Sequence, residues 1–226
     1  MKILAIDTTS KFFCLGIYDN GKVFEYSLEL GRKLSMLLHA TIKRTLEAAG
    51  LDIGGIDYFA CGLGPGSFTG ARIGLAAVKG LCFSLKKPVI GISTLDILAK
   101  DVLLNSNQIV PVIDAKRNLI YCAIFQHKNG RLTRKHPYML LSQEEFFRAI
   151  KPQAVVLGDA LSLHKDKILK QVKGVKVLDT GFWYPKAHNI LEIALERIRQ
   201  KKLDNPFSLK PIYLYPKECQ IKKCLK

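Results

Sequence analysis

The stretch of sequence that decides the fold is GPGSFTGARIG, from Gly64 to Gly74. It follows an apolar run at residues 56–63 that is typical of a strand, and it opens an apolar run that predicts a helix to about residue 85. A strand, a glycine-rich turn and a helix bring backbone close either to a phosphate or to another segment of protein.

The residues of this turn favour a tight bend over a known phosphate loop. Gly64 and Gly66 allow backbone angles that other residues avoid, and Pro65 fixes one angle between them. Ser67 and Thr69 could both cap the helix by accepting a free N–H. The spacing gives neither a P-loop, which needs a lysine, nor a complete dinucleotide-binding fingerprint.

Small residues then follow at helical spacing. Gly66, Gly70, Gly74 and Ala77 fall at i, i+4, i+8 and i+11, on one face of the predicted helix. Glycine inside a helix costs up to ~1 kcal/mol relative to alanine. The two interior glycines therefore indicate that something packs closely there, either from the same chain or from a partner.

Composition predicts a folded, cytoplasmic protein. The chain has 226 residues, of which 48% are hydrophobic, enough for one large or two small domains. No apolar run approaches the ~20 residues of a membrane span, and Asp7 interrupts the start too early for a signal peptide. The six cysteines form no CxxC, and the five histidines show no metal-ligand spacing, so we expect no metal site. Cys219 and Cys224, five apart in a basic tail, have no assigned role.

The positive charge is concentrated in the second half. The formal net charge is +16; residues 1–110 hold 12 Lys and Arg against 9 Asp and Glu, whereas residues 111–226 hold 23 against 10. A basic half favours polyanions such as RNA, although a solvated lysine-rich surface would give the same composition.

The chain repeats one pattern. AIDTTSKFFCLGIYDNG (Ala5–Gly21) resembles VIDAKRNLIYCAIFQHKNG (Val112–Gly130), with Asp7 matching Asp114. Each stretch predicts a β-hairpin whose first strand ends in aspartate. The repeat predicts an α/β protein made of two related domains, each a mixed sheet flanked by helices, at residues 1–105 and 106–226.

The remaining elements are predicted from periodicity and capping. We expect strands at 22–30, 88–92, 109–114, 119–125 and 154–157, and helices at 34–49, 94–102, 143–150 and 188–200. The proline-containing tail at 205–215 is expected to fold back over the protein.

Four strings, in order, resemble the TsaB (YeaZ) family: AIDTTS, GLGPGSFTGARIG, PVIDAKRNLIYCAIF and PIYLY. The resemblance covers residues 1 to about 216. It implies the actin-like (ASKHA) fold and a non-catalytic role in making N6-threonylcarbamoyladenosine in tRNA. The implied partners are the paralogous TsaD subunit, which carries the metal and transferase site, the TsaE ATPase and, through the complex, tRNA. The resemblance also implies a homodimer when TsaD is absent. The family has also been described in the past as peptidase M22-like.

The resemblance also assigns sites. The family signature turn comprises Gly64, Pro65, Gly66, Ser67, Phe68, Thr69, Gly70 and Arg72. We expect the two helices of the first domain to dock TsaD through Leu37, Leu38, Thr41, Gly70, Ile73, Gly74 and Ala77. Asp7 and Asp114 stand where the carboxylates of actin-like enzymes position metal and phosphate, but the residues after them do not make a complete pair of phosphate hairpins. We therefore interpret both as inherited structural residues. The alternative is a nucleotide site at Asp7, Thr8 and Asp114, with ATP or ADP bound within the complex. No catalytic residue is predicted.

Two other classes of function remain open: an enzyme, of either of two kinds, and an independent RNA-binding protein. An actin-like nucleotide hydrolase would use Asp7. A glycoprotease-like peptidase would need a nucleophile with a base, but the GPGSFTG string does not match the GxSxG nucleophile elbow. An independent RNA-binding protein is supported by charge alone.

Overall fold

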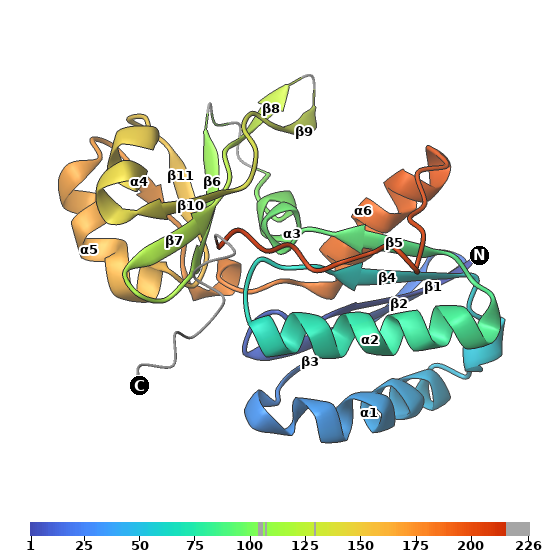
Figure 1. Ribbon diagram of the computed structural model, residues 1–226. Coiled ribbons are helices and arrows are strands. Elements are labelled where there is room, and N and C mark those ends of the chain that lie inside the picture. Colours follow the sequence, from blue (N-terminus) through green and yellow to red (C-terminus); the bar gives the residue numbers. More distant parts are fainter. Residues whose placement is uncertain (104–105, 107, 129, 216–226) are drawn as a thin grey trace, which may run out of the picture.

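The computed structural model describes residues 1–103, 106, 108–128 and 130–215, and it contains two sheets (Figure 1). The first sheet has the order β3-β2-β1-β4-β5. Its strands are β1 (Lys2–Asp7), β2 (Phe12–Asp19), β3 (Lys22–Glu29), β4 (Tyr58–Gly62) and β5 (Val89–Ile92). The first three are antiparallel neighbours, and β4 and β5 run parallel to β1. The predicted mixed sheet is confirmed.

Helices cover both faces of this sheet. α1 (Leu34–Ala48) and α2 (Phe68–Leu85) lie on one face, and α6 (Ala187–Arg199) lies on the other (Figure 1). Along β1, Leu4 belongs to the core under α1 and α2, whereas Ile3 and Ala5 belong to the core under α6. Strand side chains alternate between faces, so an apolar run without alternation is what a sheet covered on both sides requires.

By length and composition alone, α2 could cross a membrane. Its buried residues, however, pack against the sheet through strands β4, β1 and β5. This is the arrangement of a core helix in a folded domain.

The second sheet has the order β10-β7-β6-β11-β12, with β8 paired to β6 and β9 paired to β8. Its strands are β6 (Ile109–Asp114), β7 (Leu119–Cys122), β8 (Phe125–Lys128), β9 (Arg131–Arg134), β10 (Met139–Ser142), β11 (Val155–Leu157) and β12 (Lys176–Val177). Its helices are α4 (Gln143–Ala149) and α5 (Leu161–Gln171). α4 and α5 pack on one face of this sheet. The opposite face packs against α3 (Thr94–Lys100), which precedes the sheet in the chain. Short 3-10 turns lie at Gly31–Lys33, Ile53–Gly55 and Thr180–Phe182.

The repeated hairpin is confirmed. Asp7 ends β1 before β2, and Asp114 ends β6 before β7, in the same antiparallel arrangement. The predicted strand at 119–125 is wrong, because the structure divides it into β7 and β8. One antiparallel register holds for both strands, with Val112 paired to Cys122 and Ile109 paired to Phe125. In this register Pro111 lies opposite the gap between β7 and β8. Proline has no N–H to donate, so the ladder is interrupted there.

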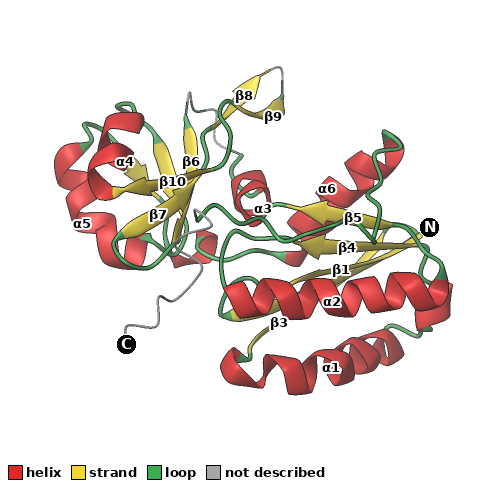
Figure 2. Ribbon diagram, viewed as in Figure 1, coloured by secondary structure: helices red, strands yellow, loops and turns green. Residues whose placement is uncertain are grey.

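The predicted domain division needs correction at its end. Residues 187–212 follow the second sheet in sequence but pack on the first, since α6 contacts β1 and β2 and Ile212 bonds to Leu63. From the end of α6 to residue 215, where the described part of the chain ends, the tail contains no helix or strand (Figure 2). Asp204 N–H donates to the Val89 carbonyl (2.9 Å) and Ile212 N–H to the Leu63 carbonyl (2.9 Å). The predicted fold-back of the tail is thereby confirmed. Cys219 and Cys224 lie outside the described residues.

Candidate functional site

The signature turn joins β4 to α2 and holds two other segments. Ser67 N–H donates to the Thr9 carbonyl (2.6 Å), which ties the turn to the first hairpin. Thr94 N–H donates to the Gly64 carbonyl (2.8 Å), which ties it to the start of α3. Ser67 also caps α2 by accepting the Gly70 N–H (3.1 Å). Of the two predicted caps, Ser67 is therefore the cap used.

The glycines of α2 make room for the first hairpin of the same chain. A Cβ on Gly70 would stand 2.0 Å from the Thr8 carbonyl oxygen, and one on Gly74 would stand 2.1 Å from Thr8 Oγ1. A Cβ on Gly66 would stand 2.4 Å from the Thr9 carbonyl oxygen. Packing within the chain thus explains the stripe. The prediction that Gly70 and Gly74 form a docking face is wrong, because both are buried under Thr8.

Asp7 is fully buried and already hydrogen-bonded. Its carboxylate accepts the N–H (2.7 Å) and hydroxyl (2.8 Å) of Thr9 and the hydroxyl of Thr94 (3.0 Å). Burial raises the pKa of Asp7, and these three hydrogen bonds act in the opposite direction. Thr8 is used in the same way, since its hydroxyl donates to the Gly70 carbonyl (2.8 Å). Both side chains are turned inward: Thr8 holds the hairpin against α2, and Asp7 holds it against Thr94 at the start of α3.

Asp114, the equivalent residue of the second hairpin, also has a partner in its own chain. It accepts the backbone N–H (2.8 Å) and the ammonium (2.5 Å) of Lys116. Burial acts to raise the pKa of Asp114, but the hydrogen bonds and charge of Lys116 outweigh it, so the pKa is lowered. Asp159 in turn accepts the Asp114 N–H (2.9 Å). In the part of the chain that the structure describes, no group of three His, Cys, Asp or Glu residues could hold a metal ion.

The outer surface of α1 and α2 carries an apolar patch beside exposed charged residues such as Lys43, Glu47 and Arg72. On α1, Met36 and Leu37 are exposed and Thr41 is half-buried. On α2, an uncharged stripe at i, i+3, i+7 and i+10 faces outward. We call these accessible side chains the helix-pair face: Met36, Leu37, Thr41, Ile73, Ala76, Gly80 and Phe83.

The predicted docking set is therefore divided. Leu37, Thr41 and Ile73 belong to the helix-pair face, whereas Leu38 and Ala77 are buried in the core of the first sheet. Sequence reasoning missed the outer stripe of α2, which the structure adds at Ala76, Gly80 and Phe83. The signal was a second pair of small residues at helical spacing, Ala76 and Gly80, six positions after Gly70 and Gly74.

The tail forms one rim of this surface. The guanidinium of Arg72 lies 3.6 Å from the ring centre of Phe68, and its Nε donates to the Tyr213 hydroxyl (2.8 Å). Further along α2, the rings of Phe83 and Phe207 meet edge to face, 4.2 Å apart. Signature residues Phe68 and Arg72 thus hold the tail along α2.

Comparisons with known proteins agree with this architecture. A family model described as "TsaD: tRNA N6-adenosine threonylcarbamoyltransferase" matches residues 29–202. The solved structure of YeaZ from Pseudomonas aeruginosa superimposes with a TM-score of 0.81 at 23% identity, covering 94% of this chain and 99% of that chain. Together with the repeated hairpins, these matches define an actin-like α/β protein.

Two curated relatives narrow the class. The tRNA threonylcarbamoyladenosine biosynthesis protein TsaB of Bacillus subtilis is 31% identical over 182 residues, covering 78% of each chain. The protein of the same name from Escherichia coli is 27% identical over 220 residues, covering 95% of this chain and 94% of its own. The chain belongs to the TsaB (YeaZ) family.

Proposed function

We propose that this chain is a non-catalytic partner subunit in the synthesis of N6-threonylcarbamoyladenosine in tRNA, and that it pairs with the metal-bearing TsaD transferase subunit through the helix-pair face. The observation that carries the proposal is a contrast between buried residues near the signature turn and the exposed helix-pair face. The residues that would serve a nucleotide, Asp7 and Thr8, are used up by contacts within the chain. The outer sides of α1 and α2, in contrast, leave apolar side chains exposed.

The shape of this face suits another pair of helices. A Cβ on Gly80 would meet nothing within 4 Å, and Ala76 beside it is exposed. Small residues at these positions let a second helix approach closely, while Met36 and Phe83 supply apolar area around them. The TsaD model matches a range that includes both helices. A TsaD relative therefore offers an equivalent pair, and two such pairs can pack as a four-helix bundle.

Other parts of the proposal follow from the same complex. The TsaE ATPase and tRNA would be its further components, and the cytoplasm its compartment. In the absence of TsaD, a second copy would cover the helix-pair face and give a homodimer. No observation favours the alternatives of a nucleotide hydrolase or a peptidase.

The proposal is tested with one substitution and a matched control. Ala76→Glu places a charge in the centre of the helix-pair face, where burial of an unpaired carboxylate is costly. Leu163→Glu places the same charge at an exposed leucine of α5, away from that face. We expect Ala76→Glu to abolish co-purification with TsaD and tRNA modification in the reconstituted system, and Leu163→Glu to retain pairing. ATP hydrolysis or proteolysis by the chain alone, lost in a folded Asp7→Asn variant, would contradict a non-catalytic role.

A further inference from the structure

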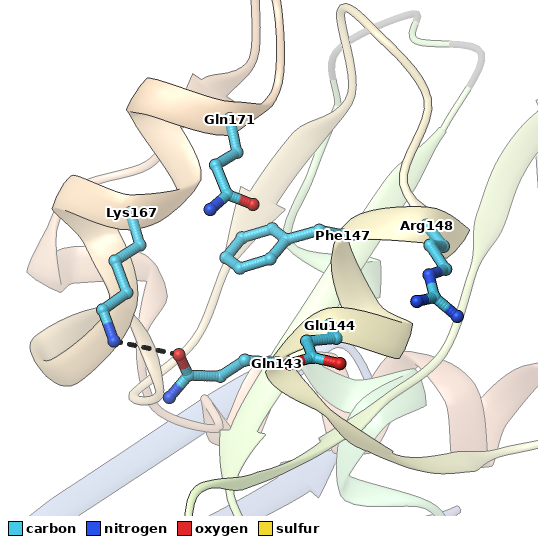
Figure 3. A pocket seen from close by; sticks show the side chains of 6 residues that line it. All are labelled: Gln143, Glu144, Phe147, Arg148, Lys167 and Gln171. Carbon is cyan, nitrogen blue, oxygen red and sulfur yellow. Dashed lines mark hydrogen bonds between the residues drawn. The ribbon is translucent and has the colours of Figure 1, made fainter.

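A groove on the second sheet's helices has no role in the proposed pairing. It lies between α4 and α5, encloses about 520 Å³, and is lined by Gln143, Glu144, Phe147, Arg148, Lys167 and Gln171 (Figure 3). α4 and α5 pack beside the second sheet, whereas the helix-pair face belongs to the first (Figure 1). The groove therefore stays accessible when α1 and α2 are covered.

The groove presents a ring between two amides. The ring of Phe147 points from α4 toward α5, between the side chains of Gln143 and Gln171 (Figure 3). Phe146, fully buried behind it, meets this ring edge on at 5.9 Å, which fixes its position. An aromatic ring offers a stacking surface to any base, and amide side chains can donate to and accept from base edges.

One cation is already oriented within the groove. The ammonium of Lys167 donates to Gln143 Oε1 (3.0 Å), which holds the lysine of α5 over the gap to α4. Arg148 lies on the α4 side of the groove. Glu144 is the single acidic side chain of the lining. Its neighbour Glu145 is occupied by the N-terminal cap of α4, where it accepts the Ser142 N–H (2.8 Å).

The segment that carries the groove, residues 143–176, is basic, with seven Lys and Arg against four Asp and Glu. Between residues 143 and 176 the chain carries seven exposed cations, and none of them lies within 4.0 Å of a carboxylate of the described residues. They are Arg148, Lys151, Lys165, Lys167, Lys170, Lys173 and Lys176. On α5 the cations are Lys165, Lys167 and Lys170, which span about 7.5 Å along the helix axis at 1.5 Å per residue. Together with Arg148 on α4, they can contact more than one phosphate of a strand.

We propose that this groove binds an unpaired nucleotide of an RNA strand, with the base on Phe147 and the flanking phosphates at Lys167 and Arg148. The inference rests on the proposed function, in which the RNA is the tRNA of the complex. It assigns tRNA contact to a particular surface of this subunit, and it gives the positive charge of the second half of the sequence a role in binding RNA.

The test uses the complete complex with TsaD and measures tRNA affinity across a range of salt concentrations. The double variant Lys167→Gln with Arg148→Gln removes two charges at the groove. The control, Lys22→Gln with Lys202→Gln, removes two exposed charges beside the first sheet. At ~0.7–0.9 counterions per phosphate contact, the groove variant should lower the log–log salt slope by about 1.4–1.8. We expect a loss of at least tenfold in affinity at low salt, and less than threefold for the control.

A second variant tests the stacking. Phe147→Leu retains apolar bulk in the core contact and removes the ring, so thermal unfolding should change little while tRNA affinity falls at least fivefold. Equal affinity of wild type and both groove variants for tRNA, in complexes that still form and still modify tRNA, would overturn this inference and leave the proposed function standing. Tight binding of free AMP that depends on Phe147, without any effect on tRNA, would also overturn it. Loss of TsaD pairing in the groove variants would count against the proposed function, which places the pairing surface on α1 and α2.

Discussion

The hydroxyl of Thr8 donates a hydrogen bond of 2.8 Å to the carbonyl oxygen of Gly70, across 62 residues of sequence. A helical carbonyl receives the side chain of the first hairpin because Gly70 and Gly74 have no Cβ to separate the two segments. This contact couples the signature turn to the fold of the first domain. The geometry of the turn therefore serves the stability of the fold, and in the proposed pairing the partner would bind the opposite side of α2.

Gly70→Ala is expected to destabilise the protein, whereas Gly80→Ala is expected to stabilise it. The new methyl at Gly70 would overlap the Thr8 carbonyl oxygen, which is backbone and cannot rotate away. Overpacking of this kind costs about 1–3 kcal/mol, occasionally more. At Gly80 the space is open, so the higher helix propensity of alanine should raise the free energy of unfolding by up to ~1 kcal/mol. Urea denaturation of the two variants measures both signs, and equal destabilisation by both would contradict the packing argument.

Asp7→Asn is expected to change the pH dependence of stability in one direction. Burial raises the pKa of the folded Asp7 carboxyl above its ordinary value of 3.8, so the folded state binds the proton more tightly than the unfolded state. Wild-type stability should therefore fall, relative to Asp7→Asn, as the pH rises from about 3.8 through the folded pKa, and the difference should be constant above it. Chemical denaturation of both proteins at several pH values gives this difference. A difference that does not vary with pH would show that the carboxyl titrates normally.

The fragment 1–105 is expected not to fold alone. It lacks α6 and the tail, so the face of the first sheet under Ile190 and Leu191 would be exposed to water. Addition of a peptide spanning 186–215 should restore structure, because that segment supplies the missing helix and the contact between Asp204 and Val89. Circular dichroism of the fragment with and without the peptide makes the measurement. A cooperative thermal transition of 1–105 by itself would show that the first half is an independent domain.

Much of the fold could be predicted from local signals. The two hairpins share a pattern of strand, aspartate and polar turn, and Ser142 caps α4 through a capping box that its sequence context indicates. The return of α6 to the first sheet could not be predicted, because amphipathic spacing in a helix shows which face is buried and does not say against which sheet. The break opposite Pro111 depends on strand register, which the spacing of apolar residues in 119–125 does not reveal.

The site was harder to predict than the fold. α2 carries small residues on two stripes, one with Gly70 and Gly74 and the other with Ala76 and Gly80, and helical spacing identifies each stripe without saying which one is outside. The burial of the first stripe depends on Thr8, a residue of another element. Likewise, Asp7 stands where a phosphate-binding carboxylate would stand, and only its three hydrogen bonds show that it is committed to the fold.

The proposed function depends most on the helix-pair face, and the affinity of the purified chain for TsaD tests that face most directly. Titration calorimetry should give a heterodimer with the wild-type chain and with Leu163→Glu, and no measurable binding with Ala76→Glu at the same concentrations. Folding of each variant is checked by its thermal transition. Unchanged affinity of a folded Ala76→Glu variant for TsaD would contradict the assignment of this face as the docking surface.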